Sequence, residues 1–157
     1  MEVKIKRLSD TAIMPTYGSN EAACLDLYAD INEGYGNTPL NYAQPNTCVI
    51  APHTSIKICT GFAFQPPKGY CGLIFARSGI ATKQGLRPAN CVGVCDGDYT
   101  GEYIVALHND SEVPKIVHHG DRIAQLMFVP VQQVKLKEVD ELEETTRGDG
   151  GFGSTGK

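Results

Sequence analysis

Several features that would assign this chain to a common class are missing from its 157 residues. No apolar run approaches the roughly 20 residues that a membrane-spanning helix requires, so we do not expect a membrane protein. The net charge is only −4, which argues against a nucleic-acid coat or a basic membrane patch. A polyphosphate ligand would need a local cluster of cations, for which Arg77, Arg147 and Lys157 are candidates, although each could equally be ordinary surface charge.

Signals for disulfides, zinc and secretion are also missing. No Cys-x-x-Cys pair occurs, and the four histidines lack the spacing of a structural zinc site. Residues 1–7 alternate charged and apolar side chains, which predicts a first strand, and they include no apolar stretch typical of a signal peptide. We therefore expect a cytoplasmic protein, or one of the host-cell interior if a virus or phage encodes it, with reduced and mostly buried cysteines.

The chain does contain short apolar runs that turn residues interrupt about every ten residues, a pattern that favours β-strands over helices. Its length suits one domain. In residues 102–109, the side chains of Tyr103, Val105 and Leu107 share one face, as a half-buried strand requires. The pattern predicts a sandwich, barrel or jelly roll. Strands are expected at residues 24–29, 47–51, 55–65, 69–77, 102–109 and 122–134.

Two segments interrupt this pattern. Residues 32–46 are rich in Gly, Asn and Pro and predict a long surface loop that looks like an insertion. Residues 141–157 pass from an acidic run into RGDGGFGSTGK, which is too poor in large side chains to pack alone and should be mobile. We expect a β domain at 1–140 and a flexible C-terminal arm at 141–157.

The arm contains two phosphate-binding patterns that fail on context. Residues 148–153 fit GxGxxG, but that fingerprint needs a strand before it and a helix after it. Residues 151–157 fit GxxxxGK without the Ser or Thr that should follow. The arm could still close over a nucleotide through its N–H groups, the guanidinium of Arg147 and the ring of Phe152. A disordered tail without a role is the alternative.

Five segments, in order, resemble those of the trimeric dUTPase family. They span nearly the whole chain, and together they are far more specific than any one alone. The segments are 23–29 (ACLDLYA), 76–79 (ARSG), 90–102 (NCVGVCDGDYTGE), 120–126 (GDRIAQL) and 147–156 (RGDGGFGSTG).

The resemblance implies an all-β, jelly-roll-like β-barrel of the trimeric dUTPase type with a flexible glycine-rich C-terminal arm. It implies a homotrimer with shared active sites, in which the arm of one subunit closes over the pocket of another. The third segment would form a β-hairpin whose backbone reads uracil, while the Tyr99 ring excludes a 2′-hydroxyl. A backbone edge can pair uracil's donors and acceptors, whereas cytosine would leave buried polar groups unpaired.

The reaction implied is Mg²⁺-dependent hydrolysis of dUTP to dUMP and pyrophosphate. Asp96 would act as the general base for water attack on the α-phosphorus. Mg²⁺ would be held by the substrate phosphates and water, with no direct protein ligand, and Asp26 would support it through its water shell or through local hydrogen bonds. The implied substrate-binding residues are Arg77, Ser78, Gly79, Asn90, Gly93, Val94, Cys95, Tyr99, Ile104, Gln125, Arg147, Phe152, Gly153, Ser154 and Thr155.

Other interpretations stay open. Asp96 and Asp98 could simply form a tight turn, Arg77 could be a surface ion-pair residue, and Gln125 could be a buried amide satisfied by a neighbouring strand. The chain departs from the family pattern at Cys24, where glycine is usual, and at Ala76, where proline is common. A dCTP deaminase-like enzyme of the same fold, or a family member with an added regulatory protein-binding role, is the functional alternative.

Overall fold

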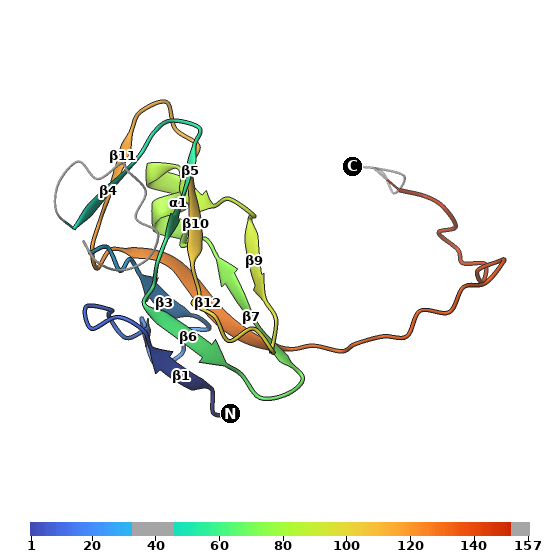
Figure 1. The fold of residues 1–157 in the computed structure, drawn as a ribbon. Coiled ribbons are helices and arrows are strands. Elements are labelled where there is room, and N and C mark those ends of the chain that lie inside the picture. The colour runs from blue at the N-terminus through green and yellow to red at the C-terminus, as the bar shows by residue number, and fades with distance from the viewer. Residues whose placement is uncertain (33–45, 152–157) are drawn as a thin grey trace.

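The computed structural model describes residues 1–32 and 46–151, which form mostly short strands and one short helix (Figure 1). All strand pairs are antiparallel, so the all-β class predicted from the sequence is confirmed. The elements are β1 (Lys4–Arg7), β2 (Thr16–Tyr17), β3 (Leu25–Tyr28), β4 (Thr47–Ile50), β5 (Ser55–Ile58), β6 (Phe62–Gln65), β7 (Tyr70–Phe75), α1 (Ser78–Gln84), β8 (Leu86–Pro88), β9 (Val92–Cys95), β10 (Val105–Asn109), β11 (Lys115–His118) and β12 (Arg122–Pro130).

The largest sheet has five strands in the order β2-β3-β12-β7-β9, which leaves β9 at an edge. A three-stranded sheet, β5-β10-β8, lies against it, and two pairs, β1-β6 and β4-β11, complete the body. Apart from β2 and β3, neighbouring strands in these sheets are not consecutive in sequence, so the fold depends on long-range pairing rather than on hairpins alone. This arrangement places the ends of β3, β7 and β12 side by side, which positions the candidate site.

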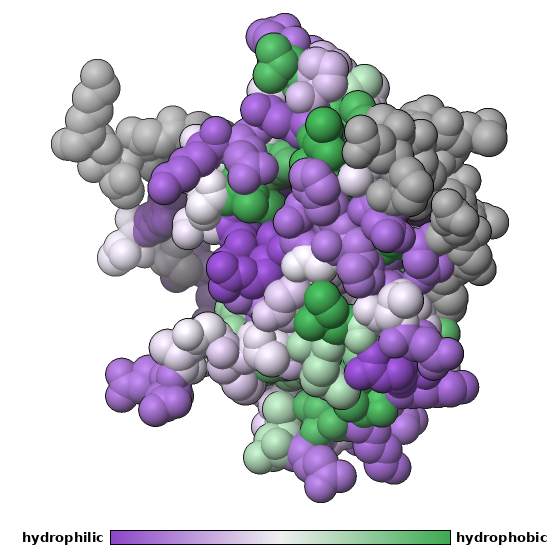
Figure 2. All heavy atoms as spheres, turned by 90° about the vertical axis from the view of Figure 1, so that its left-hand side faces the viewer, coloured by the Kyte–Doolittle hydropathy of each residue, from purple (hydrophilic) through white to green (hydrophobic). Residues whose placement is uncertain are grey.

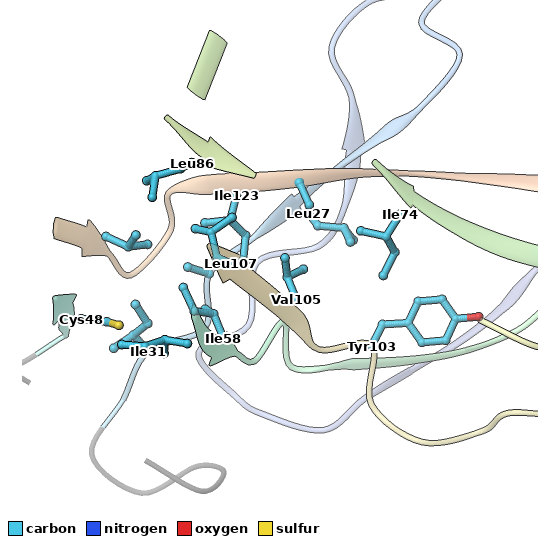
Figure 3. Packing of buried hydrophobic residues seen from close by; sticks show 14 of the residues in the cluster. Leu27, Ile31, Cys48, Ile58, Ile74, Leu86, Tyr103, Val105, Leu107 and Ile123 are labelled. Atoms are coloured by element: carbon cyan, nitrogen blue, oxygen red, sulfur yellow. The ribbon is translucent and has the colours of Figure 1, made fainter. Parts of the chain in front are cut away.

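The core lies between the two larger sheets. Figure 3 shows Leu27, Ile74, Val105, Leu107 and Ile123 converging from β3, β7, β10 and β12. The alternation expected around β10 is confirmed, since Tyr103, Val105 and Leu107 are 1%, 2% and 0% exposed. Burial of such large apolar side chains is the main favourable contribution to folding.

Each predicted strand has different boundaries in the structure, and three of the differences bear on the fold. The expected strand 55–65 is two strands, β5 and β6, because Gly61 between them has φ +73°, a left-handed conformation that ends the extended backbone. The strand expected at 122–134 ends at Pro130, and the one expected at 102–109 begins at Val105. β12 stops at residue 130 because its partner β7 begins at the paired Tyr70, where Gly69 has φ +85°, a left-handed conformation that ends the extended backbone.

Some elements were not expected from the sequence. The helix α1 has seven residues and ends at Gly85, whose φ of +70° and backbone N–H bond to the Ala81 carbonyl form a left-handed cap. The strands β2, β8 and β11 have two to four residues each, too few to show a period.

The six cysteines are free, as expected, but only Cys48 and Cys71 are fully buried, while Cys91 is exposed. The expectation of mostly buried thiols is therefore wrong, because Cys24, Cys59 and Cys95 lie at intermediate depth. Of the predicted 32–46 loop, residues 33–45 lie outside the described part of the chain. Within the described residues, no helix is long and apolar enough to cross a membrane.

The chain after β12 leaves the body. Residues 131–151 form no strand or helix, and Figure 1 shows them running away from the sheets. The face drawn in Figure 2 is mostly hydrophilic, with hydrophobic residues in separate patches, as on an ordinary protein surface. Three apolar side chains of this segment are strongly exposed, since Val134, Leu136 and Leu142 are 72%, 94% and 87% exposed. These three side chains are therefore little covered by the rest of the described chain.

Candidate active site

A cluster of charged and amide side chains lies at one end of the five-stranded sheet. Asp26, on β3, is buried and accepts a hydrogen bond on each carboxylate oxygen, from Arg77 Nε at 2.7 Å and from Arg122 Nη1 at 3.0 Å. Arg77 Nη1 also donates to the Arg122 carbonyl at 3.3 Å. Gln125 lies opposite Asp26 in the sheet, and its Nε2 donates to the Ala76 carbonyl at 2.9 Å. We call Asp26, Arg77, Arg122 and Gln125 the arginine cluster.

The arginine cluster contains three of the predicted site residues and one that the sequence did not single out. Arg77 is in an ion pair, and the Gln125 amide is satisfied by the chain that follows a neighbouring strand, so both alternative interpretations describe real contacts. Such contacts also fix the side chains in place, and fixed side chains are what a binding site needs. Arg122 was missed because only its position opposite Tyr28, two residues from Asp26, brings it into the cluster.

Ser78 and Gly79 begin α1 directly after Arg77 and are exposed. A Cβ added at Gly79 would meet no atom within 4 Å, so the space beside this backbone is open. The turn from β7 into α1 is held by the Gln125 bond to the Ala76 carbonyl. These two residues therefore present exposed backbone next to the arginine cluster.

A second group of predicted residues lies in the turn after β9. The Tyr99 N–H donates to the Asp96 carbonyl at 3.1 Å, so this segment does form the tight turn considered from the sequence. Asp96 is exposed, and its carboxylate makes no ion pair with any residue in 1–32 or 46–151. It lines an open cleft of about 960 Å³ together with Lys68, Tyr70 and Asp98. A solvent molecule can therefore reach this carboxylate.

Packing around Gly101 fixes the Tyr99 ring. The ring stacks on Tyr103 with centroids 6.1 Å apart, and its hydroxyl donates to the Glu102 carbonyl at 3.0 Å. A Cβ at Gly101 would lie 2.5 Å from the Tyr99 hydroxyl oxygen, so only glycine leaves room for the ring. The Glu102 carboxylate in turn accepts the N–H of Gly61 at 2.7 Å, which anchors the segment to the core.

Among the described strands β9 pairs only with β7, so none of them covers the backbone groups along its other edge. Gly93 is buried against Ile74, where an added Cβ would lie 3.2 Å from the Ile74 Cβ. Val94 and Ile104 are 65% and 40% exposed, and Asn90 is exposed where the chain enters β9. Burial raises the pKa of the Cys95 thiol to about 11, so this thiol is uncharged at neutral pH.

Within one chain these two groups lie apart. Cys95 pairs with Gly72 across β7 and β9, and Arg77 lies five residues beyond Gly72 in nearly extended backbone. At about 3.3 Å per residue, Asp96 and the arginine cluster are therefore on the order of 16 Å apart. One chain alone does not bring Asp96 to Arg77.

Arg147 lies in the segment 131–151, which runs away from the sheets that carry both groups (Figure 1). Its side chain is exposed, and its Nε donates to the Gly150 carbonyl at 2.8 Å, a contact local to the arm. The other predicted arm residues, Phe152, Gly153, Ser154 and Thr155, lie outside the described residues.

Comparison with known proteins agrees with these motifs. The dUTPase family model matches residues 40–156. A deoxyuridine 5'-triphosphate nucleotidohydrolase of Hydrogenobaculum sp. (strain Y04AAS1) is 38% identical over 156 residues, covering 99% of each chain. One from Desulfitobacterium hafniense (strain DSM 10664 / DCB-2) is 43% identical over 144 residues, covering 91% of this chain and 87% of the relative.

The fold is also similar to a solved structure. The Staphylococcus bacteriophage 80alpha dUTPase with dUPNHPP matches with a TM-score of 0.83 and 28% identity, over 99% of both chains. The jelly-roll-like fold expected from the motifs is therefore confirmed. With the family model matching most of its length and close relatives matching nearly all of it, this chain belongs to the dUTPase family.

Proposed function

We propose that this protein hydrolyses dUTP to dUMP and pyrophosphate, with Asp96 as the general base. The observation that carries the mechanism is an exposed carboxylate, without an ion pair in the described chain, next to an unpaired strand edge. The relatives named deoxyuridine 5'-triphosphate nucleotidohydrolase support the overall reaction.

In this mechanism Asp96 accepts a proton from a water molecule as the water oxygen attacks the α-phosphorus. A new P–O bond forms to the water oxygen, the bond from the α-phosphorus to the bridging oxygen breaks, and pyrophosphate leaves. General-base help of this kind is typically worth about 10²–10⁴ in rate. Because no arginine or lysine of the described residues holds the Asp96 carboxylate, its oxygens are available to take that proton.

The arginine cluster would bind the triphosphate. Arg77 provides charge and N–H donors, Ser78 and Gly79 provide exposed groups of the adjoining turn, and Gln125 keeps that turn in place. Guanidinium groups match phosphate oxygens in geometry and charge, and they are favoured for this role in proteins.

The β9 edge and its turn would bind the nucleoside. The free edge of β9 at Gly93, Val94 and Cys95, with Asn90, can pair with the uracil edge, and Ile104 adds a contact beyond the turn. The Tyr99 ring, held by Glu102 and Tyr103, would pack against the deoxyribose and leave no room for a 2′-hydroxyl.

A complete site then needs more than one chain, because Asp96 and Arg77 are too far apart in one. A homotrimer in which the β9 turn of one subunit meets the arginine cluster of another satisfies this requirement. The arm, which leaves the body with its apolar side chains exposed, would reach a neighbouring subunit and bring Arg147, Phe152, Gly153, Ser154 and Thr155 over the substrate.

Mg²⁺ fits this site as an ion carried mainly by the substrate. The described residues contain no group of three or more His, Cys, Asp or Glu side chains that could hold a metal, and both Asp26 oxygens already accept from arginines. When bound to the phosphates, the ion neutralises part of their charge. Asp26 would affect it only indirectly, through the arginines it holds or through the water around the ion.

The direct test is release of pyrophosphate from dUTP, compared with dCTP, dTTP and UTP at equal concentration with added Mg²⁺. We expect turnover of dUTP and at least about 10²-fold lower kcat/KM for the others, since mismatched polar groups are strongly rejected in a buried site. Release of ammonia from dCTP would instead identify a deaminase. Binding of dUTP without pyrophosphate release would identify a non-catalytic protein.

The arm is tested separately by removing residues 147–157. Since residues 131–151 form no strand or helix, this truncation should leave the melting temperature unchanged. Turnover should fall about 10²-fold, the usual cost of imperfect positioning. Full activity of the truncated protein would show that the arm has no role.

A further inference from the structure

The arginine cluster contains a cation that the proposed mechanism does not use. Arg122 begins β12 and its side chain is 50% exposed, whereas that of Arg77 is 22% exposed. Both side chains point to one carboxylate, since Asp26 accepts Arg77 on Oδ1 and Arg122 on Oδ2. A single exposed ion pair is usually worth little, but here two cations share one buried anion.

Sharing Asp26 between two arginines sets the net charge of the arginine cluster. One carboxylate between two guanidiniums leaves one net positive charge at the cluster. Without Arg122, the Asp26 charge would be cancelled by Arg77 alone, and the pair would be neutral. A neutral pair attracts a triphosphate far less than a cluster that retains a positive charge.

One other carboxylate lies near enough to alter this balance. Asp121, Arg77 and Arg122 line a small cavity of about 230 Å³ beside α1. However, Asp121 Oδ2 accepts the His118 backbone N–H at 2.8 Å and lies 3.5 Å from His118 Nδ1. Within the described residues it makes no ion pair with either arginine, so Asp26 is the anion that the two arginines share.

We infer that Arg122 is a positioning residue of the phosphate site, and that it neutralises Asp26 so that Arg77 keeps its positive charge for the triphosphate. Arg122 also completes the hydrogen bonding of Asp26, which holds the carboxylate against Arg77 Nε. The inference rests on the proposed dUTP hydrolysis and adds a residue outside the assigned substrate contacts. It predicts that the role of Arg122 grows with the number of phosphates on the ligand.

The test compares Arg122→Met and Arg122→Lys with the wild-type protein, by calorimetric binding of α,β-imido-dUTP and of dUMP. For Arg122→Met we expect about a tenfold or greater loss of affinity for the imido-dUTP, the effect of losing a charged interaction, and less than about threefold for dUMP. Arg122→Lys should regain most of the loss, because it restores the charge without the planar guanidinium. Arg87→Met is the matched control, since Arg87 also pairs with an aspartate, Asp110, but in the other sheet.

Each contrary result is distinct. Equal losses for imido-dUTP and dUMP would mean that Arg122 only maintains pocket shape, and no loss or no rescue by lysine would also overturn the inference. Melting temperatures of all variants show whether Arg122→Met unfolds. If it does, the affinity of Arg122→Lys for imido-dUTP is compared with that of the wild type. Affinity that is mostly retained supports the inference, and a large loss overturns it. A wild-type protein that neither binds imido-dUTP nor releases pyrophosphate would instead refute the proposed function.

Discussion

The two ends of β7 carry the two halves of the proposed active site, and they differ in how far a single chain completes them. After Phe75, the arginine cluster is closed by its own hydrogen bonds, with Asp26 buried between two guanidiniums. Near Tyr70, the Asp96 turn is exposed beside a strand edge that pairs with no other strand of residues 1–32 and 46–151. The first half is preorganised within the chain, whereas the second half is open to a ligand and to another subunit. The comparison therefore separates what folding of one chain provides from what the proposed assembly would provide.

The strongest way to break this comparison is to remove the Asp96 carboxylate. Asp96→Asn keeps the size of an exposed side chain without any ion pair, so folding and binding of imido-dUTP should be nearly unchanged. Hydrolysis should slow by about 10²–10⁴ or more, because the amide cannot accept the proton. Single-turnover release of pyrophosphate measures the effect, and a normal rate would remove Asp96 as the base.

Mixing two inactive variants sharpens the comparison. Asp96→Asn lacks the proposed base and Arg77→Met lacks the proposed phosphate contact, so each variant alone should have little activity. After unfolding and refolding together at equal amounts, about a quarter of the sites should combine an intact Asp96 with an intact Arg77 from another chain. Pyrophosphate release should then return to about that fraction of wild type. A mixture no more active than its parts would mean that sites are not shared.

A substitution at Gly61 tests the stability of the fold that supports both halves of the site. An added Cβ would lie 2.3 Å from the Ala12 Cβ and 2.9 Å from Asp30 Oδ2, and φ is +73°. Gly61→Ala should therefore lower the free energy of unfolding by about 2–3 kcal/mol. Gly69→Ala is the control for backbone strain alone, since Gly69 has φ +85° with no atom within 4 Å of an added Cβ, and it should cost about 1 kcal/mol. Equal losses in urea denaturation would show that crowding at Gly61 is unimportant.

How much of this could be predicted from the sequence depends on the range of the interaction. The alternation of Tyr103, Val105 and Leu107 indicates their burial because it is a local period. The left-handed turn at Gly61 leaves no periodic pattern in the sequence, and the apolar residues that follow it resemble a continuation of the strand. The contact of Arg122 with Asp26 arises from pairing between β3 and β12, which residue spacing does not reveal. The motif resemblance predicted the chemistry, but not the distance between its parts in one chain.

The smallest expected effect is a difference in thiol reactivity between cysteines that are partly buried and one that is exposed. Burial and the nearby Glu102 carboxylate raise the pKa of Cys59 to about 12, and burial raises that of Cys95 to about 11. Only the thiolate reacts, so at pH 8 about one Cys59 thiol in 10⁴ is reactive. Iodoacetamide should label the exposed Cys91 well before these two, and raising the pH toward 11 should speed labelling of Cys95. Rapid labelling of Cys59 at pH 8, read by peptide mass spectrometry, would contradict its raised pKa.

The separation of Asp96 from Arg77 along β7 has a consequence for the amount of protein that a cell must make. In the proposed arrangement a solitary chain has no working catalytic centre, so turnover per molecule depends on how often chains meet. At low abundance, halving synthesis would lower dUTP removal by more than half. The activity in the cell would then rise more steeply than in proportion to the concentration of the protein.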